Sequence, residues 1–133
     1  MSRPLPLALG LLLVVGAIAG CATSADGDHA RRATQTLYSA VQRHDGTAAC
    51  AQMSPSLRAQ LVSDEDERCA KAVLGLDLHG QTPDKVKVYA NNALVRMAGG
   101  DTVFLSDTHA GWRVDALGCR PQGPGPYACE ATS

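Results

Sequence analysis

The sequence predicts an α+β fold in which N-terminal helices pack on a C-terminal antiparallel sheet. Up to about residue 80, apolar residues recur at helical spacing, as in the pair Leu37 and Val41. From Lys85 onward the apolar period becomes two, and turn residues separate short strand-like runs. Helices that come first and strands that follow are typical of a layered α+β domain. We therefore expect one sheet with one face available to the helices.

The first helix is expected over residues 28–44. Asp28 can accept hydrogen bonds from free N–H groups of the first turn, as capping residues do. Asp45 and Gly46 are a stop signal, because glycine readily takes the positive φ at which many helices end. The preceding residues 22–28 are small and polar without apolar periodicity. We expect them to be a flexible tether.

Three shorter helical segments are expected after this stop. The first spans about residues 47–53. Ser54 and Pro55 begin the next, since serine is a good N-cap and proline is tolerated in the first turn. The last spans about residues 66–74, and its start follows Ser63 and an acidic run. Carboxylates in a first turn interact favourably with the helix dipole, which explains the acidic run without a calcium site.

The C-terminal half is expected to form a four-stranded antiparallel meander. The predicted strands cover residues 85–90, 93–98, 102–107 and 112–117, with Gly99-Gly100 as one tight turn. The tail after Gly118 is rich in proline and glycine and is expected to lack regular structure. It would fold back so that Tyr127 lies on the sheet edge.

The first twenty residues have the features of a secretory signal. Arg3 precedes a charge-free apolar run, which ends in Ile18-Ala19-Gly20-Cys21. This ending resembles the lipobox of bacterial lipoproteins, in which the cysteine is diacylated on sulfur and becomes the mature N-terminus. An ordinary secretory signal or an uncleaved membrane anchor are the alternatives, although roughly fifteen apolar residues are short for a span of about 20.

The lipobox interpretation sets a domain organisation and a location. Residues 1–20 would be the signal peptide, residues 21–28 the lipidated cysteine and its tether, and residues 29–133 one disulfide-stapled domain. The expected location is the extracytoplasmic face of the cell membrane, where two acyl chains give stable anchoring.

Four cysteines remain besides Cys21, and an even number in an oxidising compartment predicts two disulfides. Three connectivities are possible. Local pairing is favoured because each local pair flanks a plausible reversal of the chain. No cysteine pair has the short spacing of structural zinc sites, and the histidines lie far apart in sequence, so we expect no metal and no cofactor. The expected disulfides are Cys50–Cys69 and Cys119–Cys129, and the histidines are His29, His44, His79 and His109.

Composition narrows the partners of this domain. The formal net charge is −1 and the charges are largely interleaved, which does not favour nucleic-acid binding. Membrane lipid bound through acylated Cys21 is one expected partner, and an envelope protein or a small apolar ligand is another. The scarce aromatic residues are candidates for the core or for a ligand cavity, above all Trp112, Tyr38 and Phe104.

The order of these features resembles that of small actinobacterial lipoproteins of no assigned activity. The resemblance is carried by the two helical cysteines around a proline-capped helix, by the meander, and by three C-terminal motifs. Such proteins are similar to the NTF2-like or cystatin-like α+β group, in which a curved sheet wraps a long helix as a cone. The resemblance implies architecture and location, and it carries no catalytic residues. The motifs are Gly111-Trp112-Arg113-Val114, Gly118-Cys119 and Pro126-Tyr127-Ala128-Cys129.

The sequence favours a binding or accessory module of the cell envelope over an enzyme. Arg113 and Asp115 share one strand face and most simply form a solvated pair. His44 adjoins a helix end, where a histidine charge is favourable. The alternative is a small cone-fold enzyme, isomerase- or dehydratase-like, acting on an apolar ligand. That enzyme would need an aspartate or histidine facing an apolar pocket, with an acid partner.

Overall fold

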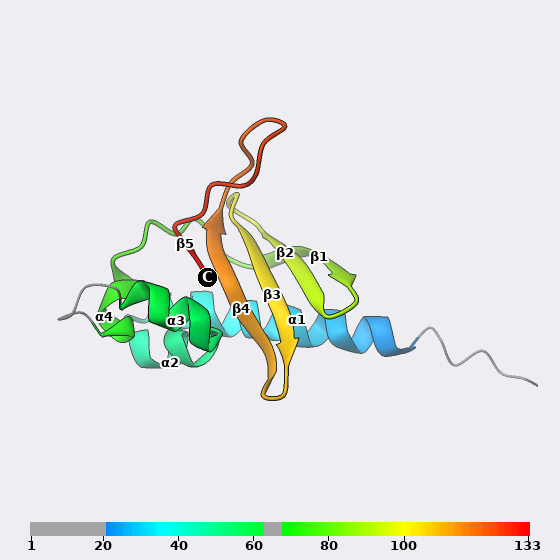
Figure 1. Cartoon of the computed structure of the whole chain (residues 1–133), viewed down its shortest axis with the longest axis horizontal. Helices are drawn as coiled ribbons and strands as arrows, with labels where there is room; N and C mark the ends of the chain where they lie inside the picture. The colour runs from blue at the N-terminus through cyan, green and yellow to red at the C-terminus, as the bar shows by residue number, and fades with distance from the viewer. Residues whose placement is uncertain (1–20, 63–67) are drawn as a thin grey trace, which may run out of the picture.

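The computed structural model describes residues 21–62 and 68–133, with side chains from residue 25 onward. The described chain forms four helices and an open five-stranded antiparallel sheet (Figure 1). The α+β class is therefore confirmed. The expected signal peptide, residues 1–20, and the acidic run with its cap, residues 63–67, lie outside the described residues.

Helix α1 spans Cys21–Gln42 and crosses one face of the sheet (Figure 1). It begins seven residues before the expected start at Asp28, so the segment expected to be a tether is helical. The physical reason is tertiary contact. A Cβ on Gly27 would lie 3.8 Å from the Val86 side chain, so the first half of α1 rests on the sheet. Such packing commonly outweighs weak helix propensity.

The end of α1 differs from the expectation that Gly46 takes a positive φ. His44 takes it instead, with φ of 58°. Asp45 becomes the N-cap of α2, Gly46–Ala51, and accepts a 3.0 Å hydrogen bond from the Ala48 N–H. The turn is therefore completed before Gly46 is reached.

Gly46 is needed for a close approach between two short helices. A Cβ at Gly46 would overlap the carbonyl oxygen of Ala70, which belongs to α4, Cys69–Leu74. The Cys50–Cys69 disulfide joins the same two helices and confirms the predicted pair. Helix α3, Pro55–Leu61, lies between α2 and α4 in sequence. Its Leu57 N–H donates a hydrogen bond to the Ser54 side chain, as expected for an N-cap.

The sheet contains one strand more than the expected four. Its strand order follows the chain, and all neighbouring strands are antiparallel. The additional strand, β5, has only two residues, and Ala131 pairs with Leu117 of β4. The Cys119–Cys129 disulfide brings the tail back as predicted, but the pairing of the returned tail with β4 as a strand was not expected. The strands are β1 (Pro83–Tyr89), β2 (Asn92–Met97), β3 (Thr102–Thr108), β4 (Gly111–Cys119) and β5 (Ala131–Thr132).

The core fills the space between α1 and the inner face of the sheet. Trp112 and Tyr38 belong to this core, with exposed fractions of 5% and 2%. Within the described residues, none of the helices combines the length and hydropathy required to cross a membrane. Fully buried aliphatic residues supply the rest of the core, among them Leu37, Val95, Val103, Leu105, Val114 and Leu117.

Candidate ligand-binding site

A row of paired residues crosses the sheet and takes one member from every strand. Lys87 pairs with Leu94, and Leu94 pairs with Phe104. Phe104 pairs in turn with Ala116, and Ala116 with Thr132. Residues paired across antiparallel strands project to the same face of the sheet. The row therefore changes from a cation through apolar side chains to a hydroxyl.

This row lies on the outer face, away from α1. The Val86 and Val88 side chains approach Gly27 of α1, so they face inward. Side chains alternate between the two faces along a strand, which places Lys87 and Tyr89 on the opposite face. The core occupies the inner face, so the outer face is where a ligand finds accessible side chains.

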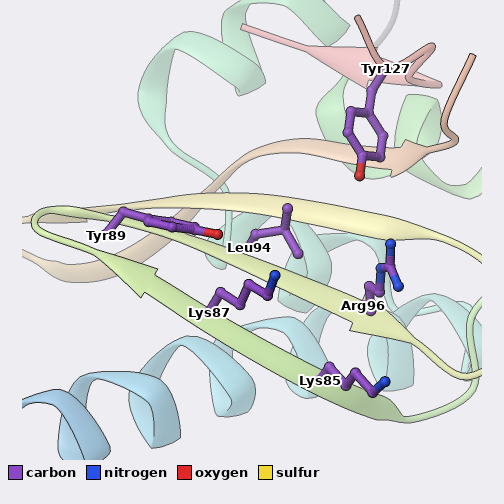
Figure 2. Close-up of a pocket in the computed structure, with 6 residues that line it drawn as sticks. All are labelled: Lys85, Lys87, Tyr89, Leu94, Arg96 and Tyr127. Carbon is purple, nitrogen blue, oxygen red and sulfur yellow. The ribbon is translucent and has the colours of Figure 1, made fainter. Parts of the chain in front are cut away.

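One end of the outer face forms a basic groove of about 370 Å³. Figure 2 shows the Lys85, Lys87 and Arg96 side chains on the same side of the sheet, with the Tyr127 ring reaching toward them from the C-terminal segment. The described lining includes three cations and no carboxylate. An anion therefore finds favourable charge here. The lining residues are Lys85, Lys87, Tyr89, Leu94, Arg96 and Tyr127.

A second depression, the apolar hollow, adjoins this groove and measures about 540 Å³. Tyr127 lines both depressions. Its ring meets Phe104 edge to face, with ring centroids 5.2 Å apart and an interplanar angle of 81°. Edge-to-face pairing of this kind is a favoured aromatic geometry. The lining residues are Asn92, Ala93, Phe104, Leu105, Asp115, Ala116, Pro126, Tyr127, Cys129 and Thr132.

The position of Tyr127 depends on the C-terminal loop that the Cys119–Cys129 disulfide closes. Arg120 and Ala128 exchange two backbone hydrogen bonds, of 2.7 and 3.0 Å, beside this disulfide. The loop therefore holds Tyr127 over the outer face. The expectation that Tyr127 lies on the sheet edge was wrong, because its ring packs on Phe104 of the central strand β3 and lines both outer-face depressions.

The three aromatic residues singled out from the sequence separate into two environments. Trp112 and Tyr38 are buried in the core. Phe104 is half-buried on the outer face and lines the apolar hollow. Both predicted disulfides are confirmed. Cys21 begins α1, and its acylation stays a prediction.

Arg113 and Asp115, which the sequence places on one strand face, line different depressions. Asp115 belongs to the apolar hollow. Arg113 lines a smaller depression beside His29 and Arg32 of α1, and its Nη1 donates a 2.9 Å hydrogen bond to the Trp112 carbonyl. Within the described part of the chain, no group of three potential metal-ligating side chains is close enough to hold an ion.

Sequence reasoning missed a buried carboxylate at Asp101. Its Oδ2 accepts hydrogen bonds from the Tyr38 hydroxyl at 3.0 Å and from the His79 N–H at 2.7 Å. Its Oδ1 has no hydrogen-bond partner among the described residues, but Arg120 Nε lies 3.7 Å away, within ion-pair range. Burial, reinforced by the Asp101 charge, raises the pKa of Tyr38 far above its ordinary value. The hydroxyl therefore remains a donor.

This cluster ties elements together and does not line the outer-face depressions. Gly99-Gly100 marks the turn before Asp101, but the burial of Asp101 depends on Tyr38, 63 positions away.

Comparison with protein-family models, with curated proteins and with solved structures gives no match for this chain.

Proposed function

We propose that this protein is a lipid-anchored module of the cell envelope that binds a small ligand on the outer face of its sheet without catalysing a reaction. The observation that carries the proposal is the pair of adjoining depressions that share Tyr127. Their volumes of about 370 and 540 Å³ fall in the range of small-molecule sites, roughly 300–1,000 Å³. The motif that ends in Cys21 supports the anchor.

A binding role fits the chemistry of these depressions better than catalysis does. Acid–base catalysis requires a carboxylate or histidine with a partner acid in reach of the substrate. Asp115 is the acidic residue of the described apolar lining, and its sequence neighbour Arg113 lines a different depression. The remaining lining offers aromatic rings, small side chains and cations, which are groups that bind and orient.

A small ligand is favoured over an envelope protein because the outer face is hollowed. A protein partner would be expected to cover the surface around the depressions, whereas a small ligand would fill the depressions themselves. The two occupants also differ in mass, which the following experiment measures.

The ligand is tested by native mass spectrometry of the full-length protein, extracted from cell membranes in mild detergent. We expect the wild type to carry a small-molecule mass that Phe104→Asp loses. Leu74→Asp is the matched control, because Leu74 is a partly exposed apolar residue of α4, outside the lining of both depressions. An equal small-molecule mass on the Phe104 variant would contradict the site. A protein that co-purifies in stoichiometric amount and is lost in Phe104→Asp would instead indicate a docking surface.

The anchor is tested separately by metabolic labelling with an alkyne fatty acid. Cys21→Ala should abolish the label and release the protein from membranes, while Ser24→Ala should keep both. Membrane retention of the Cys21 variant, together with an unlabelled wild type, would exclude lipidation.

A further inference from the structure

We infer that the ligand is an anionic amphiphile whose charged head occupies the basic groove and whose apolar body lies in the apolar hollow. This inference rests on the proposed function, because it assigns the chemistry of the ligand at the same outer face. It follows from three features of that face: an unfavourable pair of cations, the polarity of the cross-sheet row, and the position of one carboxylate.

The first feature is a like-charge pair in the basic groove. Lys85 and Arg96 are directly paired across β1 and β2, and both line the groove. Like charges opposite each other on neighbouring strands are destabilising. Lys87 adds a third cation, although the chain as a whole has a formal net charge of −1. An anionic group between these side chains would relieve their repulsion, and it could be a carboxylate, sulfate or phosphate.

The second feature is the polarity of the row that crosses the sheet. The row runs from Lys87 through Leu94 to Phe104 and Ala116. Neighbouring strands are about 4.8 Å apart, so Phe104 lies roughly 10 Å from the cationic end. The ring of Tyr127 stands over the middle of this path and lines both depressions. A ligand with an anionic end and an apolar body of that length matches the row.

The third feature fixes the direction of the ligand. Asp115 is on β4, at the end of the apolar hollow farther from β1 in strand order. Its carboxylate would repel an anionic head placed there, whereas the groove attracts it. The head therefore belongs over β1 and β2, and the body over β3 and β4.

The test uses the full-length protein in neutral phosphatidylcholine nanodiscs, titrated with three probes of equal chain length. The probes are octanoate, octanol and octyltrimethylammonium. Binding is measured from the chemical shifts of the Leu94 and Phe104 amides. The carboxylate of octanoate can form exposed ion pairs with the cations of the groove, so we expect octanoate to bind about tenfold more tightly than octanol, and the cation to bind least.

Variants assign the two ends of the ligand. Lys85→Gln/Lys87→Gln should weaken octanoate binding about fivefold and leave octanol binding unchanged. The matched control Arg43→Gln/Arg58→Gln removes two exposed cations of the helical layer and should leave both affinities unchanged. Phe104→Ser should weaken octanoate and octanol equally, because it shortens the apolar surface that both share.

The outcomes separate this inference from the proposed function. Equal binding of octanol and octanoate, both lost in Phe104→Ser, would overturn the anionic head and leave the outer-face site intact. Shifts at neither residue with any probe would overturn both. Nanodiscs that contain phosphatidylglycerol distinguish the two sources of an anionic head. Shifts of the Lys85 and Arg96 amides in these discs support a membrane lipid, and octanoate binding without such shifts supports a free amphiphile.

Discussion

The Tyr38 hydroxyl donates a 3.0 Å hydrogen bond to the Asp101 carboxylate, and both side chains are buried. Tyr38 belongs to α1, and Asp101 precedes β3. The same carboxylate oxygen accepts the His79 N–H from the segment before β1. One buried oxygen thus joins three segments that are distant in sequence, and the stability of the domain should be sensitive to its partners.

Tyr38→Phe should lower the free energy of unfolding by about 1–3 kcal/mol, because it leaves a buried carboxylate with one donor fewer. Urea denaturation followed by circular dichroism measures this change. Tyr89→Phe is the matched control and should stay within about 0.5 kcal/mol of the wild type, since Tyr89 is 57% exposed. An unchanged midpoint for Tyr38→Phe would show that the other donors suffice for Asp101.

Stability should also decrease at alkaline pH, and Tyr38 should contribute to this decrease. Its pKa in the folded state is raised by burial and by Asp101, so the folded protein retains a proton that the unfolded chain releases. The stabilisation is complete below the unfolded pKa of about 10 and is lost at higher pH, by at most about 1.4 kcal/mol per pH unit.

Denaturation at several pH values between 8 and 11 tests this pH dependence. The wild-type curve should be steeper above pH 10 than that of Tyr38→Phe, which lacks the titrating group. Parallel curves for the two proteins would contradict the assignment to Tyr38.

Gly46→Ala should destabilise the protein by about 1–3 kcal/mol, because the new Cβ would overlap the Ala70 backbone and separate α2 from α4. Gly75→Ala provides the contrast. Its new Cβ would lie 3.5 Å from the Ala72 carbonyl oxygen, an ordinary contact, and its φ of −88° suits any residue. We expect that variant to be neutral or more stable by up to about 1 kcal/mol. The measurement is the thermal unfolding of both variants. An equal change in their melting temperatures would contradict the role assigned to Gly46.

The two disulfides should affect stability alike and ligand binding differently. Removing either pair by serine substitution should lower stability by about 3 kcal/mol in the chain-entropy model, for sequence separations of 19 and 10 residues. Loss of Cys119–Cys129 should also weaken octanoate binding, because Tyr127 is no longer held over the sheet. Loss of Cys50–Cys69 should leave the affinity of the remaining folded protein unchanged, and an equal loss of affinity in both variants would contradict this assignment.

The elements that the sequence predicted are those with local signals. The alternation of Val86 and Val88 with lysines predicted β1, and Ser54-Pro55 predicted the start of α3, because each signal acts within a few residues. Phe104 was identified as a candidate for a core or cavity position, and it lines the apolar hollow.

The features that the sequence did not predict depend on contacts between distant residues. The two-residue β5 exists because a disulfide returns the tail to β4. Asp101 is buried because Tyr38 and the His79 N–H meet it. Lys85 and Arg96 form a like-charge pair through the register of β1 with β2, which no spacing along the chain discloses.

The early start of α1 has a mechanical consequence. The helix is continuous for 22 residues, a length of about 33 Å, and it already packs against the sheet at Gly27, in its first half. A lipid on Cys21 would therefore be attached to the end of one continuous helix that packs against the sheet. Rotation about that attachment point would turn the whole domain as one piece. The direction of α1 would therefore set the angle at which the outer face meets its surroundings.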